Sequence, residues 1–108
     1  MSENANSFGR VIANSRKKLK LNQKELAAKI FREDQVAISP QYLNDIEHNR
    51  RSPSSDNIIK QFSKVLKIDQ DFLYFLAGKL PEDIRKSKLN EERTAEFMMA
   101  FRQAIKPK

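Results

Sequence analysis

Leu21-Asn22-Gln23-Lys24-Glu25-Leu26 and Ile38-Ser39-Pro40-Gln41-Tyr42-Leu43 begin two helices in the same way within one short chain. In each stretch an apolar residue precedes a side chain that can cap a helix, and a second apolar residue follows four positions after that cap. The expected caps are Asn22 and Ser39. Glu25 can reach back to the amide of the first cap, and Pro40 suits the first helical position after the second. The sequence therefore predicts two consecutive helices, one after each cap.

The rest of the chain predicts further helices and no strand alternation. One helix is expected from just after Ser7 to about Leu19, and the helix that follows Asn22 is expected to reach about Ile30. Residues 31–38 either continue that helix or form a loop, and the helix after Ser39 is expected to end near His48. The remaining expectations are a helix carrying Ile58, Ile59, Phe62, Val65 and Leu66, a helix Phe72–Ala77 capped by Asp69 and ended by Gly78, a polar stretch from Glu82 to Asn90, and a last helix from Glu91 to Ile105.

The composition limits what the protein can do. Its 108 residues, 39% of them hydrophobic, are enough for a small helical core and too few for a large enzyme with a deep cleft. The 21 Lys and Arg against 14 Asp and Glu give a formal charge of +7, which favours polyanionic partners. A chain without cysteine has no disulfide or thiolate metal site and suits a reducing compartment. No apolar run has membrane-spanning length, and Met1–Asn6 lack the features of a secretory signal, so a cytoplasmic location is expected.

Three groups of residues share the spacing of a known family. They are Leu21-Asn22-Gln23-x-Glu25-Leu26-Ala27, Ile38-Ser39-x-x-Tyr42-Leu43-x-x-Ile46-Glu47 and Arg50-x-x-Pro53-Ser54. Together they resemble the Xre-type, lambda-repressor-like helix-turn-helix regulators, and the resemblance covers roughly Phe8 to Ala77. It implies an all-α fold, with a five-helix lambda-repressor-like DNA-binding domain and here an additional C-terminal helix. It also implies that the third helix enters the major groove, that the second crosses the phosphate backbone, and that dimers bind two-fold symmetric sites.

By position, the resemblance assigns base reading to the start of the third helix, at Gln41, Tyr42, Asn44 and Asp45. Gln41 and Asn44 are the best candidates, because a side-chain amide matches the donor and acceptor of adenine and because residues three apart share a helix face. The alternative for both is ordinary solvated polar surface. Tyr42 either contacts a thymine methyl or a phosphate, or it supports the neighbouring loop. Asp45 either accepts from a cytosine amino group, or it excludes wrong sites or acts as a capping partner.

Phosphate contacts are expected from the starts of the second and third helices and from the loop after the third. The candidates are Asn22, Gln23, Lys24, Ser39, Arg50 and Arg51. Among them, Gln23 resembles the family's phosphate-contacting glutamine, whereas Arg50 and Arg51 have the alternative of a solvated charged loop. The resemblance further implies a structural ion pair between Arg16 and Glu47, which would fix the third helix to the first.

The chain departs from the family pattern at two places. Several extra residues around Phe31–Ala37 lengthen the turn between the second and third helices, which leaves the docking angle of the third helix open. After the third helix, Asn49 stands where the family commonly has glycine. Asparagine keeps access to the left-handed backbone conformation at some energetic cost, so this substitution is expected to be benign.

No arrangement typical of catalysis or metal binding is detectable. Glu33-Asp34, Glu82-Asp83 and Glu91-Glu92 are sequence neighbours, a pattern typical of N-terminal turns and solvent faces rather than of acid-base pairs. The single histidine, His48, has no clustered ligands beside it, and two glycines cannot make a glycine-rich phosphate loop. We therefore expect no enzymatic activity, no cofactor and no metal.

Two units are expected: a helix-turn-helix DNA-binding domain over residues 7–78 and a C-terminal helical extension over residues 79–108. The apolar stripe of the last helix either folds back on the domain or pairs with a second chain. It consists of Phe97, Met98, Phe101 and Ile105. Pairing is expected, because one helix-turn-helix unit contacts few base pairs and two units joined together bind as one strong site.

The expected function is sequence-specific binding of double-stranded DNA by a homodimeric transcriptional regulator, a repressor of an inverted-repeat operator with no membrane partner. An alternative is an antitoxin-type protein, which would autoregulate DNA and bind a partner protein through its C-terminal helix. A third class is a basic protein that coats DNA without sequence preference.

Overall fold

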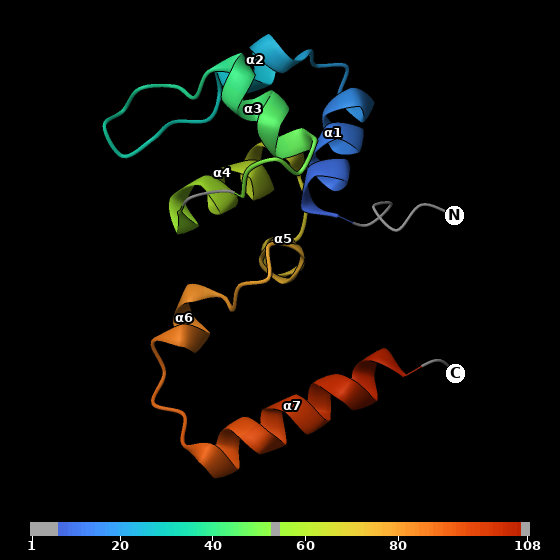
Figure 1. The fold of residues 1–108 in the computed structure, drawn as a ribbon, viewed down its shortest axis with the longest axis vertical. Helices are drawn as coiled ribbons and strands as arrows, with labels where there is room; N and C mark the ends of the chain where they lie inside the picture. The colour runs from blue at the N-terminus through green and yellow to red at the C-terminus, as the bar shows by residue number, and fades with distance from the viewer. Residues whose placement is uncertain (1–6, 53–54, 107–108) are drawn as a thin grey trace.

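The chain is built from helices. The computed structural model describes residues 7–52 and 55–106, and over these residues it has seven helices and no strand (Figure 1). The helices are α1 Phe8–Lys18, α2 Gln23–Ala27, α3 Pro40–Glu47, α4 Asp56–Leu66, α5 Gln70–Leu76, α6 Glu82–Arg85 and α7 Glu91–Ile105. The fold is therefore all-α, as expected, with α2 and α3 as the helix-turn-helix. The expected lead-in Met1–Asn6 and the Pro53-Ser54 pair lie outside the described residues.

Helix starts are set by local side chains. Over the described residues, every helix except α6 begins after a side chain that accepts a hydrogen bond from the backbone N–H three residues later. The caps are Ser7, Asn22, Ser39, Ser55, Asp69 and Asn90. At α2 the reciprocal bond is also present, since the backbone N–H of Asn22 donates to Glu25 Oε1 at 2.9 Å. These bonds satisfy amides that have no partner within the helix, which confirms the expected caps at Asn22, Ser39 and Asp69.

One hydrophobic core holds α1 to α5 together. Its buried residues are Phe8, Ile12, Leu26, Ala27, Ile30, Ile38, Leu43, Ile46, Ile58, Ile59, Phe62, Leu66, Leu73 and Tyr74. The rings of Phe8 and Phe62 meet edge to face, with centroids 6.1 Å apart, and this contact joins α1 to α4. The described residues from Lys79 onward contribute no buried side chain to this core.

The second helix is shorter than expected. It ends at Ala27 rather than near Ile30, because Ile30 enters the core outside the helix and its carbonyl accepts from the N–H of Ile38 at 2.9 Å. This backbone contact requires the chain to leave the helix, turn and return.

Residues 31–37 form a hairpin, which settles the question left open for this segment. Arg32 N donates to Val36 O at 2.9 Å, and Gln35 takes a left-handed φ of 70° at the tip. The base of the hairpin is tied to α4, since Phe31 N donates to Gln61 Oε1 at 2.7 Å and Gln61 Nε2 donates back to Phe31 O at 2.6 Å. In Figure 1 the hairpin projects away from the helices between α2 and α3.

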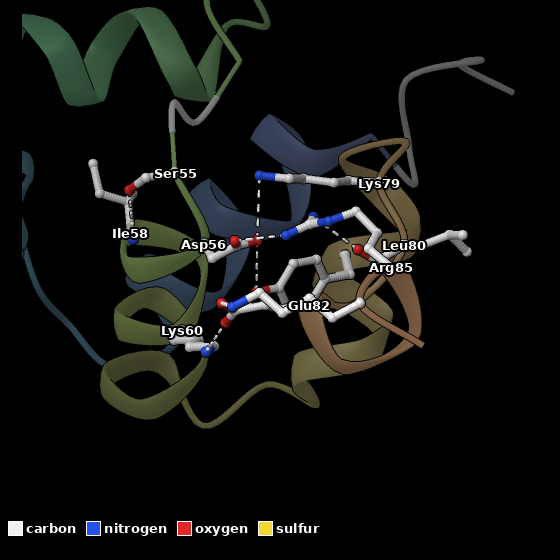
Figure 2. Close-up of polar contacts among 10 residues, drawn as sticks. Ser55, Asp56, Ile58, Lys60, Lys79, Leu80, Glu82 and Arg85 are labelled. Carbon is white, nitrogen blue, oxygen red and sulfur yellow. Dashed lines mark hydrogen bonds and ion pairs between the residues drawn. The ribbon is translucent and has the colours of Figure 1, made fainter. Parts of the chain in front are cut away.

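A cluster of charged side chains holds the segment after α5 against α4 (Figure 2). Asp56, the first residue of α4, receives Arg85 Nη2 at 2.6 Å, Lys79 Nζ at 3.2 Å and the Tyr74 hydroxyl at 3.0 Å. The Arg85 guanidinium, assisted by Lys79 and Tyr74, holds the pKa of the Asp56 carboxyl far below its usual range. Burial and the bond to Asp56 raise the pKa of Tyr74 to about 12.

The short helix α6 lies where only a polar stretch was expected. Glu82 in its first turn lies 2.8 Å from Lys60 Nζ of α4 and 2.8 Å from Lys86 Nζ, and these ammonium groups lower the pKa of Glu82 to about 2. An acidic residue in the first turn also favours the helix dipole. Ion pairs, rather than apolar burial, therefore place α6.

The last helix lies at the end of the molecule opposite α2 and α3 (Figure 1). It runs from Glu91 to Ile105, as expected, and none of its residues is buried. Its apolar side touches α5 through the rings of Phe75 and Phe101, with centroids 5.7 Å apart, and Phe97 stacks on Phe101 at 6.5 Å. Met99 and Ile105 remain 57% and 65% exposed. Part of the apolar surface of α7 is thus left open.

Candidate nucleic-acid interface

Helix α3 has one buried side and one open side. Leu43, Ile46 and Glu47 are buried, whereas Gln41 is exposed and Asn44 is half-buried. The start of the helix is fixed by Ser39, whose hydroxyl accepts from Tyr42 N at 3.0 Å, and by Pro40 at the first helical position. The N-terminal end of α3 therefore presents polar side chains from a rigid support.

A buried ion pair fixes α3 to α1. Arg16 Nε donates to Glu47 Oε2 at 2.7 Å and Arg16 Nη2 donates to Oε1 at 3.0 Å, a two-bond arrangement that Arg geometry favours. The two residues are 9% and 7% exposed. Arg16 Nη1 also donates to the carbonyl of Leu21, just before α2. This one guanidinium therefore ties together α1, the start of α2 and the end of α3.

The second helix joins the same network through Gln23. Its Nε2 donates to Glu47 Oε1 at 2.9 Å and to Asn44 Oδ1 at 3.0 Å. Both amide hydrogens of Gln23 are thus directed inward. A phosphate contact by this side chain would need a different rotamer, so its position here is that of a support for Asn44.

The backbones of α1 and α3 approach each other closely at Gly9. A Cβ atom at Gly9 would lie within 3.0 Å of the carbonyl oxygens of Ile46 and Glu47, at the end of α3. The backbone N–H of Gly9 donates to Asn49 Oδ1 at 3.0 Å, and Asn49 Nδ2 donates to Ser7 Oγ at 3.0 Å. Asn49 adopts a left-handed φ of 59°, which confirms that it can take the place of glycine after α3.

An open groove runs along the exposed side of α3. From α3 and its cap it is lined by Ser39, Gln41, Tyr42 and Asp45, from the hairpin side by Arg32, Val36, Ala37 and Ile38, and from the loop after α3 by Arg51. Three of the four predicted base-reading residues therefore share one groove. The fourth, Asn44, lies toward Gln23 and α2.

Internal contacts hold the charged side chains of this groove in place. Asp45 Oδ1 accepts from Gln41 Nε2 at 3.0 Å and from Arg50, whose Nε and Nη2 lie 3.3 and 3.2 Å away. The Arg51 guanidinium lies 5.1 Å from the centre of the Tyr42 ring, a cation–π distance. Tyr42 also packs against the core, so its ring supports the loop after α3.

The other predicted phosphate contacts lie at the helix starts and in the loop. Asn22 and Ser39 cap α2 and α3, Lys24 is exposed in the first turn of α2, and Arg50 and Arg51 are exposed after α3. Sequence reasoning missed Arg32, which lines the groove from the hairpin. A basic residue inside the inserted segment was the available signal.

The comparison with known families agrees with this geometry. The model of a helix-turn-helix family matches residues 12–69, which is more than half of the chain and includes α2, α3 and α4. The chain belongs to the family of Xre-type, lambda-repressor-like helix-turn-helix regulators. Searches among curated proteins and among solved structures gave no match. As a member of this family, the protein is a DNA-binding helix-turn-helix regulator, and α3 occupies the place of the family's recognition helix.

The described residues of this helix-turn-helix regulator lack both a cluster of potential metal ligands and a membrane-spanning helix. Within residues 7–52 and 55–106, no three His, Asp or Glu side chains come together in a way that could hold a metal ion. Over the same residues, no helix has the length and apolar character needed to cross a membrane.

Proposed function

We propose that the protein represses transcription by binding a specific inverted-repeat sequence in double-stranded DNA as a homodimer. The observation that carries this proposal is the two-sided construction of α3. One side is fixed by the buried Arg16–Glu47 pair, and the other presents Gln41 in an open groove that Arg51 also lines. Bound over a promoter, such a dimer would exclude the polymerase.

Within this proposal the polar residues of α3 divide into readers and supports. Gln41 and Asn44 offer amides to adenine edges, and Gln23 orients Asn44. Asp45 holds Arg50, and Tyr42 holds Arg51, so both arginines are ordered before they meet phosphates. Asp45 accepts from Gln41 and from Arg50 through the same oxygen, Oδ1, so a base would have to be accepted through Oδ2. Asp45 ranks behind Gln41 as a reader, because a carboxylate can only accept whereas an amide both donates and accepts.

Gln41→Ala is expected to weaken binding at the cognate site by about 1–3 kcal/mol, or roughly 5- to 150-fold, and to leave binding to random duplex nearly unchanged. The reason is that an exposed amide reads base edges and contributes little to the general attraction of phosphates. Titration of a labelled operator and of a random duplex at one salt concentration measures both. Gln103→Ala, which removes an exposed amide from α7, is the matched control. Equal site preference in the Gln41 variant and wild type would contradict the assignment.

The exposed apolar side chains of the C-terminal helix are the evidence for the proposed dimer. Phe72, Phe75, Met98, Met99, Phe101 and Ile105 are each at least 36% exposed. The ring contact between Phe75 and Phe101 joins the apolar surfaces of α5 and α7. Exposed apolar surface of this kind marks interaction sites, and a second copy of α7 would bury the part formed by Met98, Phe101 and Ile105. The proposed domain of residues 7–78 then binds one half-site, and the extension of residues 79–108 joins two domains.

Phe101→Asp and Ile105→Asp are expected to convert a dimer into a monomer, because each places a charge in the apolar surface that pairing would bury. Sedimentation equilibrium should give twice the chain mass of 12.6 kDa for wild type and one chain mass for both variants. Operator binding should become weaker and lose its cooperativity. Arg102→Gln, on the same exposed helix, is the control. A variant mass equal to that of wild type would contradict pairing through α7. If the variants also lost a partner protein that wild type binds, the antitoxin-type alternative would be favoured.

A further inference from the structure

We propose that the hairpin of residues 31–37 is a second DNA-binding element, whose Arg32 binds a backbone phosphate beside the base pairs that α3 reads. This inference rests on the proposed function, because it requires the open side of α3 to face DNA. Its ligand is the phosphodiester backbone of a duplex.

The first argument is the position of Arg32. Its side chain lines the same groove as Gln41 and Arg51, so a duplex whose edge reaches Gln41 also comes close to both arginines. Arg32 belongs to the segment before α3, and Arg51 to the segment after it. DNA docked on α3 would therefore meet a guanidinium from each of these two segments.

The second argument is that the hairpin is held in one position. Two hydrogen bonds between Phe31 and Gln61 tie its base to α4, and Ile38 N donates to Ile30 O at 2.9 Å. At the tip, Asp34 Oδ1 accepts from Val36 N at 3.0 Å. An element fixed in this way loses little conformational freedom when it binds, which favours affinity.

The third argument is the distribution of charge on the hairpin. Glu33 and Asp34 line a depression beside the start of α4, together with Arg32, Ser55 and Ile58, whereas neither acidic residue lines the groove of α3. Arg32 is the charged residue that the hairpin contributes to that groove. Arg32 thus lies between the two hollows, and the acidic residues of the hairpin are absent from the one that α3 lines.

The existing partner of Arg32 is easily replaced. Arg32 Nη2 lies 3.2 Å from Asp34 Oδ2, and the two side chains are 55% and 58% exposed. Exposed pairs of this kind contribute little to stability. A phosphate offers the guanidinium a charged, two-bond acceptor, so exchange of partners on binding is favourable.

The test compares the salt dependence of binding in three single variants and wild type. Log K falls as log salt rises, and Arg32→Ala should make this slope less steep by about 0.9. The ratio of the affinity at 50 mM salt to that at 200 mM salt should then be about 3.5-fold smaller than for wild type. The loss of affinity in Arg32→Ala should be similar for operator and random duplex. Asp34→Asn keeps the acceptor for Val36 N but removes the competing charge, so it should tighten binding by about 1.5- to 5-fold. Arg93→Ala removes an exposed arginine of α7 and is the charge-matched control.

The outcomes separate the two proposals. Suppose that wild-type protein selects an operator and that Arg32→Ala has the same salt-dependence slope as Arg93→Ala. That result would overturn the role of the hairpin and leave the proposed function standing. Wild-type protein without sequence preference would count against the proposed function, and the Arg32 slope would still test the phosphate contact. Absence of any duplex binding would overturn both. Thermal melting of each variant shows that the comparison is made on folded protein.

Discussion

Replacing Glu47 with glutamine is expected to lower the free energy of unfolding by about 3–5 kcal/mol. The substitution preserves size but removes the negative charge, so the guanidinium of Arg16 remains buried without its counter-charge. Small domains have a total stability of only about 5–15 kcal/mol, so a loss of this size is severe. Urea unfolding followed by circular dichroism measures it, because a lower midpoint at constant slope reports a change in stability.

Two further variants separate the buried pair from ionic interactions in general. Lys86→Ala removes one of the two ammonium groups that contact Glu82. Because the Lys86 side chain is 73% exposed, this change should leave the unfolding midpoint nearly unchanged. The double variant Arg16→Met with Glu47→Leu should recover much of the stability lost in the single variant, because neither charge is then buried alone. A Glu47→Gln protein as stable as wild type would show that the pair does not hold α3.

Gly9→Ala is expected to lower the free energy of unfolding by about 1–3 kcal/mol. Helix propensity alone would predict the opposite, because alanine stabilises a helix by about 1 kcal/mol relative to glycine. Steric overlap decides the sign, because the new methyl group would meet the carbonyl oxygens of Ile46 and Glu47. Backbone oxygens cannot rotate away as a side chain can, so α1 and α3 must separate. Operator affinity should fall as well, since the end of α3 moves relative to the scaffold.

The control for Gly9→Ala is Asn14→Ala, which places the same residue at an exposed position of α1. Asn14→Ala should be neutral or slightly stabilising, because helix propensity acts there alone. Thermal or urea unfolding of the two variants side by side gives the comparison. Equal stability of both would mean that the close approach at Gly9 carries no cost.

The parts of the fold that were predictable from sequence are those with local causes. A cap and the amide it satisfies lie three residues apart, so Asn22 and Ser39 identify the starts of α2 and α3 directly. The end of α2 depends instead on Ile38 N meeting Ile30 O and on Gln61 holding Phe31 from thirty residues away. Periodicity contains no information about such contacts.

The candidate site shows the same division. The helix that carries Gln41 and Asn44 was predictable, and the resemblance supplied the pairing of Arg16 with Glu47. The attachment of Gln23 to both Asn44 and Glu47 was not, because an exposed-looking residue at a helix start gives no sign of what it meets in three dimensions. Likewise, α6 depends on Asp56 and Glu82 finding basic partners from separate helices and loops.

Selection of bound duplexes from a random pool at physiological salt, followed by sequencing, tests the central claim most directly. A sequence-reading homodimer built on α3 should recover an inverted repeat with half-site centres about one helical turn, or 10–10.5 base pairs, apart. The recovered sequences should lose preference at one position of each half-site when Gln41→Ala replaces wild type. Recovery of duplexes without sequence preference would contradict the claim and leave electrostatic attraction as the whole of the interaction.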